Sequence, residues 1–282
     1  MGRFENISVF EDTVDLCKNS ARLIESIKNS RESQIFVAES DSVPDGSKVA
    51  RFESEAKIIV SKKRTFEAAS AYAGKGEKVC VLNFASSTNP GGGVVNGSSA
   101  QEECLCRGST LYFTLDTDEN WARFYEPHRR SRNPLHNDDI LYTSGITVFK
   151  TDTASPKQMA ESEWYDVDVI TCAAPNLREK PSNRHNSGDG SESLLLSDSE
   201  LKKVHEQRDK RIFDVAVQQN VDVLVLGAFG CGAFMNNPAV VARVMMNLAK
   251  KYAHAFKTIE FAVYCPPYDD SNYREFIKIL EK

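Results

Sequence analysis

The residues of this chain best suited to chemistry lie in one stretch, where glycines are followed by paired acids. Three consecutive glycines, Gly91, Gly92 and Gly93, precede the triplet Gln101-Glu102-Glu103 by seven residues. Glycine allows positive φ angles and close approach of a ligand to the main chain, and backbone N–H groups in such loops bind phosphate or ribose. Carboxyl groups can transfer protons. The spacing therefore predicts a site that holds a ligand against the main chain and presents an acid to it.

Each half of this pattern also has a simpler explanation. A glycine triplet can be only a flexible turn, and acids in the first turn of a helix can serve only the helix dipole. The loop has neither the Gly-x-Gly-x-x-Gly dinucleotide fingerprint nor the Gly-Lys-Ser/Thr of a P-loop. Glu102 and Glu103 would point about 100° apart on a helix, so we expect them to take different roles.

A second glycine-rich loop follows another expected strand. Residues 221–226 are apolar except for Asp222 and lead into Gly227, Gly230 and Gly232. Because ligands of α/β sheets bind beyond the carboxyl ends of the strands, both glycine loops can converge on one ligand there. Phe234 would offer a flat apolar surface to a ribose or an adenine, and a position in the core is an equally good explanation for it.

Strands alternate with helices along the chain, which predicts an α/β fold with a mixed sheet. Strands are expected at residues 56–61, 78–82, 167–171, 221–226 and 258–264. Helices are expected within 8–30, at 65–73, from Gln101, at 119–130, from a Ser197/Glu200 capping box to about Gln219, from Asn237-Pro238, and at 273–280. Residues 31–50 are polar and turn-rich, and residues 179–193 indicate an exposed or mobile loop.

Composition narrows the classes of protein to which the chain can belong. The 282 residues, 41% of them hydrophobic, suit one large α/β domain or two small ones. The net charge of −5 argues against a general DNA or membrane surface, so an anionic ligand would be held by local backbone donors. Seven scattered cysteines indicate a reducing, intracellular compartment, cytoplasmic or nuclear.

Two smaller clusters are also candidate sites. Cys104 and Cys106 stand beside the acids, but zinc would need further ligands and the five histidines lie in unrelated surroundings, so we predict no metal site. The chain's compact basic cluster is His128, Arg129, Arg130 and Arg132. A solvated loop explains this cluster best, and a contact with a polymer or protein substrate is the alternative.

The segments with these motifs resemble, in chain order, the poly(ADP-ribose) glycohydrolases, which are elaborated macrodomains. Gly-Gly-Gly, seven residues and Gln-Glu-Glu is the signature of that family, and residues 81–86 and 105–112 are similar to its compact bacterial-type branch. The similarity continues through residues 124–129, 141–150, 169–176, 227–236 and 261–264. It spans roughly residues 57 to 280 of the chain.

The resemblance implies a macrodomain-like mixed β-sheet flanked by helices on both faces. Residues 1–50 would be an N-terminal helical extension packed on the core, and residues 51–282 the catalytic domain. The implied activity is hydrolysis of the ribose–ribose O-glycosidic bonds of poly(ADP-ribose), with release of ADP-ribose and without a cofactor or metal. Cleavage would start from the chain terminus, and we expect a monomer.

The resemblance also assigns roles to single residues. Glu103 would be the general acid/base, Glu102 would hold ribose hydroxyls, and Asn89 and Phe234 would position the distal ribose. The second glycine loop would cradle the diphosphate. The other residues expected to bind substrate are Asn83, Gly91, Gly92, Gly93, Gln101, Gly230, Cys231, Gly232 and Ala233.

Two other functions remain open from the sequence. The same pocket could hydrolyse mono-ADP-ribosylated protein or another ADP-ribosyl conjugate, with selectivity in the loops around residues 126–138 and 178–196. The chain could also be a non-catalytic ADP-ribose-binding macrodomain, although a pure binding module has no need of the acids in Gln101-Glu102-Glu103. The expected partners are poly(ADP-ribose) or ADP-ribosylated proteins, without DNA or a membrane.

Overall fold

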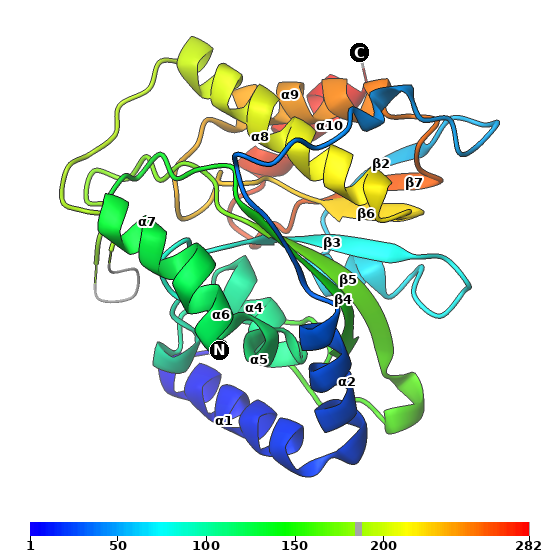
Figure 1. Cartoon of the computed structure of the whole chain (residues 1–282), viewed down its shortest axis with the longest axis vertical. Coiled ribbons are helices and arrows are strands. Elements are labelled where there is room, and N and C mark those ends of the chain that lie inside the picture. The colour runs from blue at the N-terminus through cyan, green and yellow to red at the C-terminus, as the bar shows by residue number, and fades with distance from the viewer. Residues whose placement is uncertain (184–187, 282) are drawn as a thin grey trace.

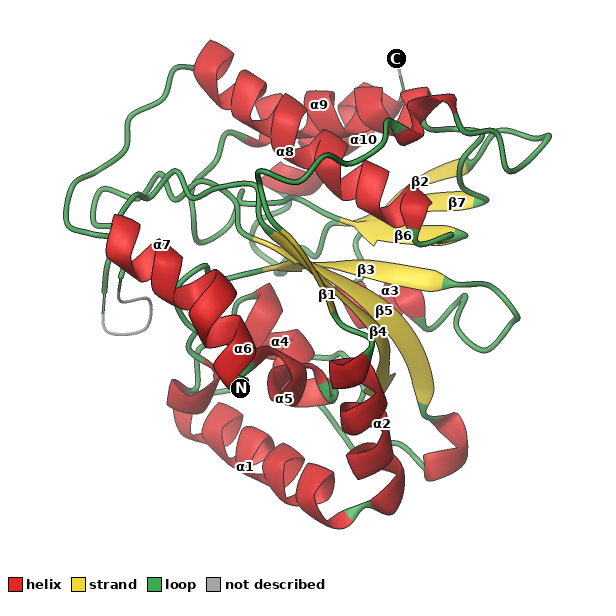
Figure 2. Cartoon of the chain, in the orientation of Figure 1, coloured by secondary structure: helices red, strands yellow, loops and turns green. Residues whose placement is uncertain are grey.

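A seven-stranded mixed sheet forms the centre of the molecule (Figures 1 and 2). The computed structural model describes residues 1–183 and 188–281. The strands lie in the order β1-β4-β5-β3-β6-β7-β2. Strands β5, β3, β6, β7 and β2 are parallel, whereas β4 is antiparallel to both of its neighbours, β1 and β5. Their bounds are β1 Ile35–Val37, β2 Lys57–Ser61, β3 Val79–Phe84, β4 Ile140–Val148, β5 Tyr165–Cys172, β6 Val223–Leu226 and β7 Thr258–Ala262.

Helices cover both faces of this sheet, as the resemblance implied (Figure 1). Helices α8 (Asp198–Gln218), α9 (Pro238–Lys251) and α10 (Ser271–Leu280) cover one face. The other face is covered by α1 Arg3–Asn19, α2 Ala21–Glu32, α3 Thr65–Ala69, α4 Gln101–Gly108, α5 Leu111–Leu115, α6 Asp118–Asn120, a π-helix at Trp121–Tyr125, and α7 Glu126–Ser131. Among the described residues no helix has the length and apolar character needed to cross a membrane.

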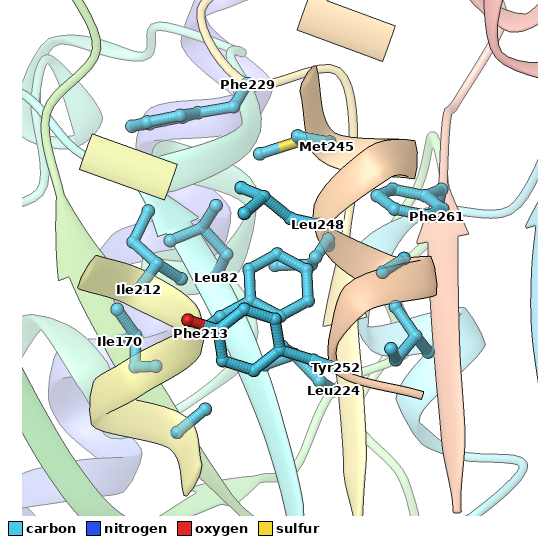
Figure 3. Close-up of a cluster of buried hydrophobic side chains, with 14 of the residues drawn as sticks. Leu82, Ile170, Ile212, Phe213, Leu224, Phe229, Met245, Leu248, Tyr252 and Phe261 are labelled. Atoms are coloured by element: carbon cyan, nitrogen blue, oxygen red, sulfur yellow. The ribbon is translucent and has the colours of Figure 1, made fainter. Parts of the chain in front are cut away.

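The central strands are buried on both faces, which explains their continuous apolar sequence. In β3, Cys80 and Leu82 belong to the core cluster under α8 and α9, whereas Val79 and Val81 belong to the cluster on the opposite face. Side chains of a strand alternate between faces, so one strand supplies both clusters. Figure 3 shows the first cluster, to which α8 contributes Phe213.

The predicted fold class is confirmed, and so are five strands and the ends of two helices. The Ser197/Glu200 capping box begins α8, and Asn237 caps α9 with Pro238 in its first turn. Two strands, β1 and β4, were not predicted. In β4 the pairing with β5 shifts between Thr143 and Ile146, and Gly145 has a φ of +68°. This irregularity interrupts the alternation that identifies a strand in sequence.

The first part of the chain differs in detail from its prediction. A single helix was expected within residues 8–30, but Ser20 ends α1 and caps α2 by accepting the Leu23 N–H. Residues 31–50 were expected to be turn-rich, yet they contain β1, an edge strand of the main sheet. The helix expected at 65–73 ends at Ala69, and the one expected at 119–130 is interrupted by the π-helix. The domain boundary near residue 50 stays a prediction.

Candidate functional site

The carboxyl ends of β3, β6 and β7 border a cavity of about 920 Å³. Both glycine loops and the start of α4 contribute to its walls. The predicted site residues that line this cavity are Gly92, Gln101, Glu102, Glu103, Gly230, Gly232, Ala233 and Phe234. The other predicted site residues, Asn83, Asn89, Gly91, Gly93 and Cys231, are not among the lining residues.

The first glycine loop lies directly against the two acids. Gly91 and Gly92 have φ angles of +65° and +59°, which favour glycine. A Cβ on Gly92 would lie 2.6 Å from Glu103 Oε1 and 3.1 Å from Glu102 Oε2, so a side chain has no room there. The Gly93 N–H donates to Glu103 Oε1 at 2.9 Å. The glycines therefore bring the main chain into contact with both carboxyl groups.

One carboxyl oxygen of Glu103 is hydrogen-bonded to the first glycine loop, and the other is not hydrogen-bonded to any described residue. Its side chain lines the cavity, although only 7% of the residue is exposed. Oε1 accepts the bond from Gly93, while Oε2 is buried and has no hydrogen-bond partner in the part of the chain that the structure describes. A buried carboxyl oxygen without a partner is rare in proteins and commonly marks a functional group. Glu103 can therefore exchange a proton with a ligand in the cavity.

Glu102 is held more firmly than its neighbour. Its Oε1 accepts from Asn83 Nδ2 at 3.2 Å, and its Oε2 accepts from the Ser86 N–H at 2.7 Å. Burial raises the pKa of Glu102 to about 8, and the negative charge of Glu103 adds to this rise. Glu102 is therefore a fixed carboxyl group that holds its proton at neutral pH.

Gln101 connects α4 to the end of β3. Its Nε2 donates to the Leu82 carbonyl at 2.8 Å and to Thr65 Oγ1 at 3.0 Å, and its Oε1 accepts the Phe84 N–H at 2.9 Å. Both ends of the side-chain amide are thus bonded within the protein. These bonds fix the start of α4, and with it the two glutamates, relative to the sheet.

The second glycine loop presents a row of backbone donors to the cavity. The N–H groups of Gly232, Ala233 and Phe234 donate no hydrogen bond to any residue within 1–183 or 188–281. All three residues line the cavity. Successive N–H groups without partners form a concave site for an anion such as phosphate. The loop can therefore bind a diphosphate without any basic side chain.

Two residues that sequence reasoning did not single out hold this loop in shape. Asn236 Nδ2 donates to the carbonyls of Pro175 at 2.7 Å and of Gly230 at 3.2 Å. Its Oδ1 lies 2.8 Å from Nε2 of the buried His205, whose Nδ1 lies 3.1 Å from Asp209. His205 and Asp209 are four residues apart on α8, a spacing that places them on one helix face and is visible in sequence.

Other predicted residues of the two loops are engaged within the protein. Cys231 packs on the core under α8 and α9, and its thiol donates to the Phe229 carbonyl. Asn89 Oδ1 accepts from Arg129 Nη2 at 2.5 Å. Phe234 is half-buried, lines the cavity, and has its ring 5.7 Å from that of His136.

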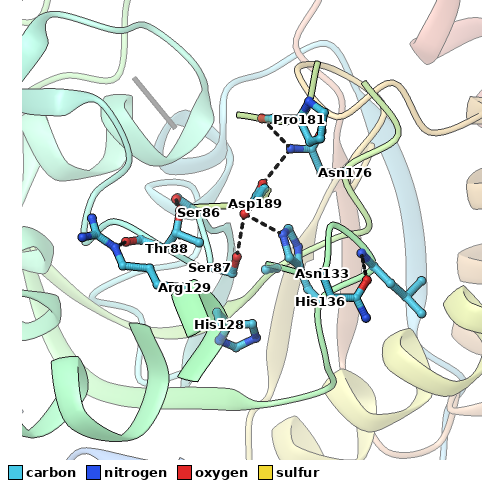
Figure 4. A network of polar contacts seen from close by, with 12 residues as sticks. Ser86, Ser87, Thr88, His128, Arg129, Asn133, His136, Asn176, Pro181 and Asp189 are labelled. Atoms are coloured by element: carbon cyan, nitrogen blue, oxygen red, sulfur yellow. Dashed lines mark hydrogen bonds and ion pairs between the residues drawn. The ribbon is translucent and has the colours of Figure 1, made fainter. Parts of the chain in front are cut away.

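Arg129 supports the first glycine loop and His128 is buried, so the hypothesis of a solvated basic loop is wrong for these two residues. Besides the bond to Asn89, Arg129 Nε donates to the Thr88 carbonyl at 2.7 Å (Figure 4). The guanidinium also lies 4.8 Å from the centre of the Trp121 ring. The sequence showed only a cluster of basic residues. In the folded chain the guanidinium of Arg129 is hydrogen-bonded to the start of the first glycine loop.

The loop expected to be exposed or mobile at 179–193 is partly buried. Residues 184–187 lie outside the described residues, but Asp189 is only 1% exposed. Its carboxylate accepts from Asn176 Nδ2 at 2.7 Å and from Ser87 Oγ at 3.5 Å, and it lies 3.2 Å from His136 Nε2 (Figure 4). Asp189 therefore attaches this loop to three other segments beside the cavity.

The cysteines near the acids have protein partners. Cys104 Sγ lies 3.3 Å from Arg107 Nη2 and 3.7 Å from Arg64 Nη1, and Cys106 is buried. No three His, Cys, Asp or Glu side chains of the described chain are grouped as metal ligands would be.

Comparisons with known proteins find one family model and several similar solved structures. The family model described as "Microbial-type PARG, catalytic domain" matches residues 9–151. The crystal structure of poly(ADP-ribose) glycohydrolase from Thermomonospora curvata is 28% identical with a TM-score of 0.84, over 98% of this chain and all of that one. The same enzyme bound to the inhibitor ADP-HPD is 27% identical with a TM-score of 0.82, over 98% of this chain and 99% of that one.

A third similar structure is poly(ADP-ribose) glycohydrolase from Deinococcus radiodurans in complex with ADP-ribose. It is 29% identical with a TM-score of 0.75, over 90% of this chain and 96% of that chain. No curated protein sequence matches the chain.

Proposed function

The chain belongs to the family of microbial-type poly(ADP-ribose) glycohydrolases, and we propose that Glu103 is the general acid/base with which it hydrolyses poly(ADP-ribose). One observation carries this assignment. Glu103 lines the cavity, and its buried Oε2 has no partner among the described residues while Oε1 is held by Gly93. The side chain is thus oriented by one oxygen and has the other available for the proton.

The proposed reaction needs a proton at the leaving oxygen and then an activated water. Cleavage of the ribose–ribose bond passes through a state with oxocarbenium character, and the departing 2′-oxygen must be protonated. Glu103 would supply this proton. As a carboxylate it would then remove a proton from the water that attacks the ribose, and so return to its starting form.

Glu102 would orient the ribose rather than transfer the proton. Its carboxyl group is fixed by Asn83 and Ser86, so it can hold a hydroxyl group at a defined position. Because its pKa is raised to about 8, the protonated form at neutral pH can donate a hydrogen bond to a ribose hydroxyl.

The second glycine loop would hold the diphosphate of the terminal ADP-ribose. The N–H groups of residues 232–234 are available to its oxygens, and Phe234 would lie against the distal ribose. Binding through the backbone suits a chain with a net charge of −5. The relatives from Thermomonospora curvata and Deinococcus radiodurans were solved with ADP-HPD and ADP-ribose respectively, which supports this ligand class.

The variant Glu103→Gln tests the proposal. We expect its kcat for release of ADP-ribose from automodified polymer to fall by about 10²–10⁴-fold, the usual contribution of general acid–base catalysis. Calorimetric affinity for ADP-ribose should be largely kept, because Gln has the same shape. The exposed Glu161 is the matched control, and Glu161→Gln should act like the wild type.

Two results would count against the proposal. Turnover of polymer by Glu103→Gln at the wild-type rate would remove the assignment. Activity of the wild type on mono-ADP-ribosylated protein but not on polymer, measured separately, would favour the alternative hydrolase.

A further inference from the structure

Arg178 lies where the chain leaves β5 and passes the second glycine loop. The neighbouring Leu177 N–H donates to the Phe234 carbonyl at 2.9 Å, which joins this segment to the loop. Arg178 itself is partly exposed and lines the same cavity as Glu103 and Phe234. A cationic side chain therefore stands on the wall beside the proposed ribose site.

The backbone around Arg178 is fixed by buried polar contacts. The Arg178 N–H lies 3.3 Å from Asn176 Oδ1, and Asn176 Nδ2 donates to the Pro181 carbonyl at 3.1 Å. Asn176 also donates to the buried Asp189 (Figure 4). The position from which the Arg178 side chain extends is therefore defined by the fold.

The other two guanidinium groups at the cavity are already engaged. Arg107 Nη1 donates to the Ser98 carbonyl at 2.5 Å, and Arg64 lies 3.8 Å from the centre of the Tyr264 ring. The side chain of Arg178, by contrast, has no hydrogen bond, ion pair or ring contact with the residues that the structure describes. Among the described residues it is therefore the cavity-lining guanidinium with no protein partner, and an anionic ligand can pair with it.

The chemistry of the polymer supplies a suitable anion. In poly(ADP-ribose) the leaving group is the 2′-oxygen of an adenosine, and the phosphate on that adenosine is only a few bonds from the scissile oxygen. In a mono-ADP-ribosylated protein the leaving group is an amino-acid side chain without that phosphate. A guanidinium binds phosphate oxygens through two parallel, charge-assisted hydrogen bonds, and an amino-acid leaving group offers no phosphate for them.

We propose that Arg178 binds a phosphate of the ADP-ribose unit on the leaving-group side of the scissile bond, and thereby favours polymer over mono-ADP-ribosylated protein. The terminal unit's own diphosphate is assigned to the N–H groups of the second glycine loop, so Arg178 is available for the next unit. This inference rests on the proposed function, because it needs Glu103 at the scissile bond.

The test compares Arg178→Gln with the wild type on polymer, on mono-ADP-ribosylated protein and on free ADP-ribose. We expect KM for polymer to rise by about tenfold, the value of one charged hydrogen bond. The KM for mono-ADP-ribosylated protein and the calorimetric Kd for ADP-ribose should change by less than about twofold. The rise in KM for polymer with salt should also be smaller in the variant, because one phosphate contact is lost.

Lys180→Gln is the matched control, since Lys180 is an exposed cation of the same segment that does not line the cavity. Lys180→Gln should leave the KM for polymer, the KM for mono-ADP-ribosylated protein and the Kd for ADP-ribose unchanged. Equal weakening of ADP-ribose and polymer by Arg178→Gln would place Arg178 on the terminal unit and overturn the inference. An unchanged KM for polymer would also overturn it while leaving the proposed function intact, whereas a wild type inactive on polymer would overturn the proposed function itself.

Discussion

Glu102 and Glu103 are adjacent in the chain, yet the fold gives their carboxyl groups different environments. Glu102 accepts hydrogen bonds at both oxygens, and Glu103 accepts one at Oε1 only. Both reach Gly92, because that residue has no side chain to separate them from the loop. The difference between the two acids therefore arises from the backbone and side-chain donors around them, and it supports separate roles in orientation and proton transfer.

The raised pKa of Glu102 predicts a pH-dependent stability that Glu102→Gln should remove. The folded-state pKa is about 8 against an ordinary 4.5, so the contribution of Glu102 is fully present below pH 4.5 and is lost as the pH rises towards 8. Each pKa unit of difference between the folded and unfolded states corresponds to about 1.4 kcal/mol of unfolding free energy. We expect the wild type to lose up to a few kcal/mol of unfolding free energy across this range relative to Glu102→Gln, in urea denaturation at several pH values. If the unfolding free energies of the two proteins changed with pH in parallel, this prediction would be contradicted.

At the scale of elements, helix α8 fixes the conformation of the second glycine loop through a contact on the side of the loop away from the cavity. His205 on α8 contacts Asn236, and Asn236 donates to the Gly230 carbonyl in the loop and to the Pro175 carbonyl in the segment after β5. Gly230 has a φ of +74° and no space for a Cβ, so the loop has little freedom once these bonds form. The backbone donors proposed to bind the diphosphate are thus positioned by a helix that does not line the cavity.

His205→Leu should weaken ADP-ribose binding through Asn236. We expect the Kd to rise by about tenfold, because the loss of the His205 bond frees the loop. In a double-mutant cycle with Asn236→Ala, the two effects should be strongly non-additive, since both variants remove the same contact. Tyr252→Phe removes another buried bond to α8, at Asp214, and should lower stability without changing the Kd. Additive effects in the cycle would argue against coupling.

At the scale of the whole molecule, the N-terminal helices are joined to the catalytic part of the fold. Asn6 on α1 donates to the Gly97 carbonyl, in the loop between the glycines and α4, at 3.0 Å. Thr13 donates to the Arg107 carbonyl at the end of α4 at 2.6 Å. Helix α1 is therefore hydrogen-bonded to the chain both before and after the two glutamates.

Lys150 is the buried cation that connects α1 to the rest of the domain. Its Nζ donates to the Val9 carbonyl and to Thr13 Oγ1, both at 2.8 Å, and pairs with Asp12. Lys150→Met removes both of these bonds and the ion pair with Asp12, so we expect a loss of about 1–3 kcal/mol of unfolding free energy in chemical denaturation. The exposed Lys157 is the control, and Lys157→Met should change stability by less than about 0.5 kcal/mol. Equal stability of both variants would show that Lys150 does not secure α1.

Local sequence patterns determined the fold class and the position of the site. Glycines that tolerate positive φ, apolar runs of strand length and the Ser197 cap depend on neighbours within a few residues, so they can be read from the chain itself. The same patterns predicted that Glu102, Glu103 and Phe234 come together, and all three line one cavity. The strands β1 and β4 were not predicted because they form by pairing with segments far away in the sequence. In β4, the irregular pairing near Gly145 also interrupts the alternating pattern.

Only the tertiary structure decided which polar groups are engaged within the protein and which face the cavity. Gln101 is bonded to the end of β3, and Arg129 is directed onto Asn89 rather than into solvent. Arg178, an ordinary basic residue of a polar loop in the sequence, lines the cavity without a described partner. The physical reason is that burial and hydrogen bonding depend on segments far apart in the chain, and their relative positions exist only after the sheet and its helices have packed.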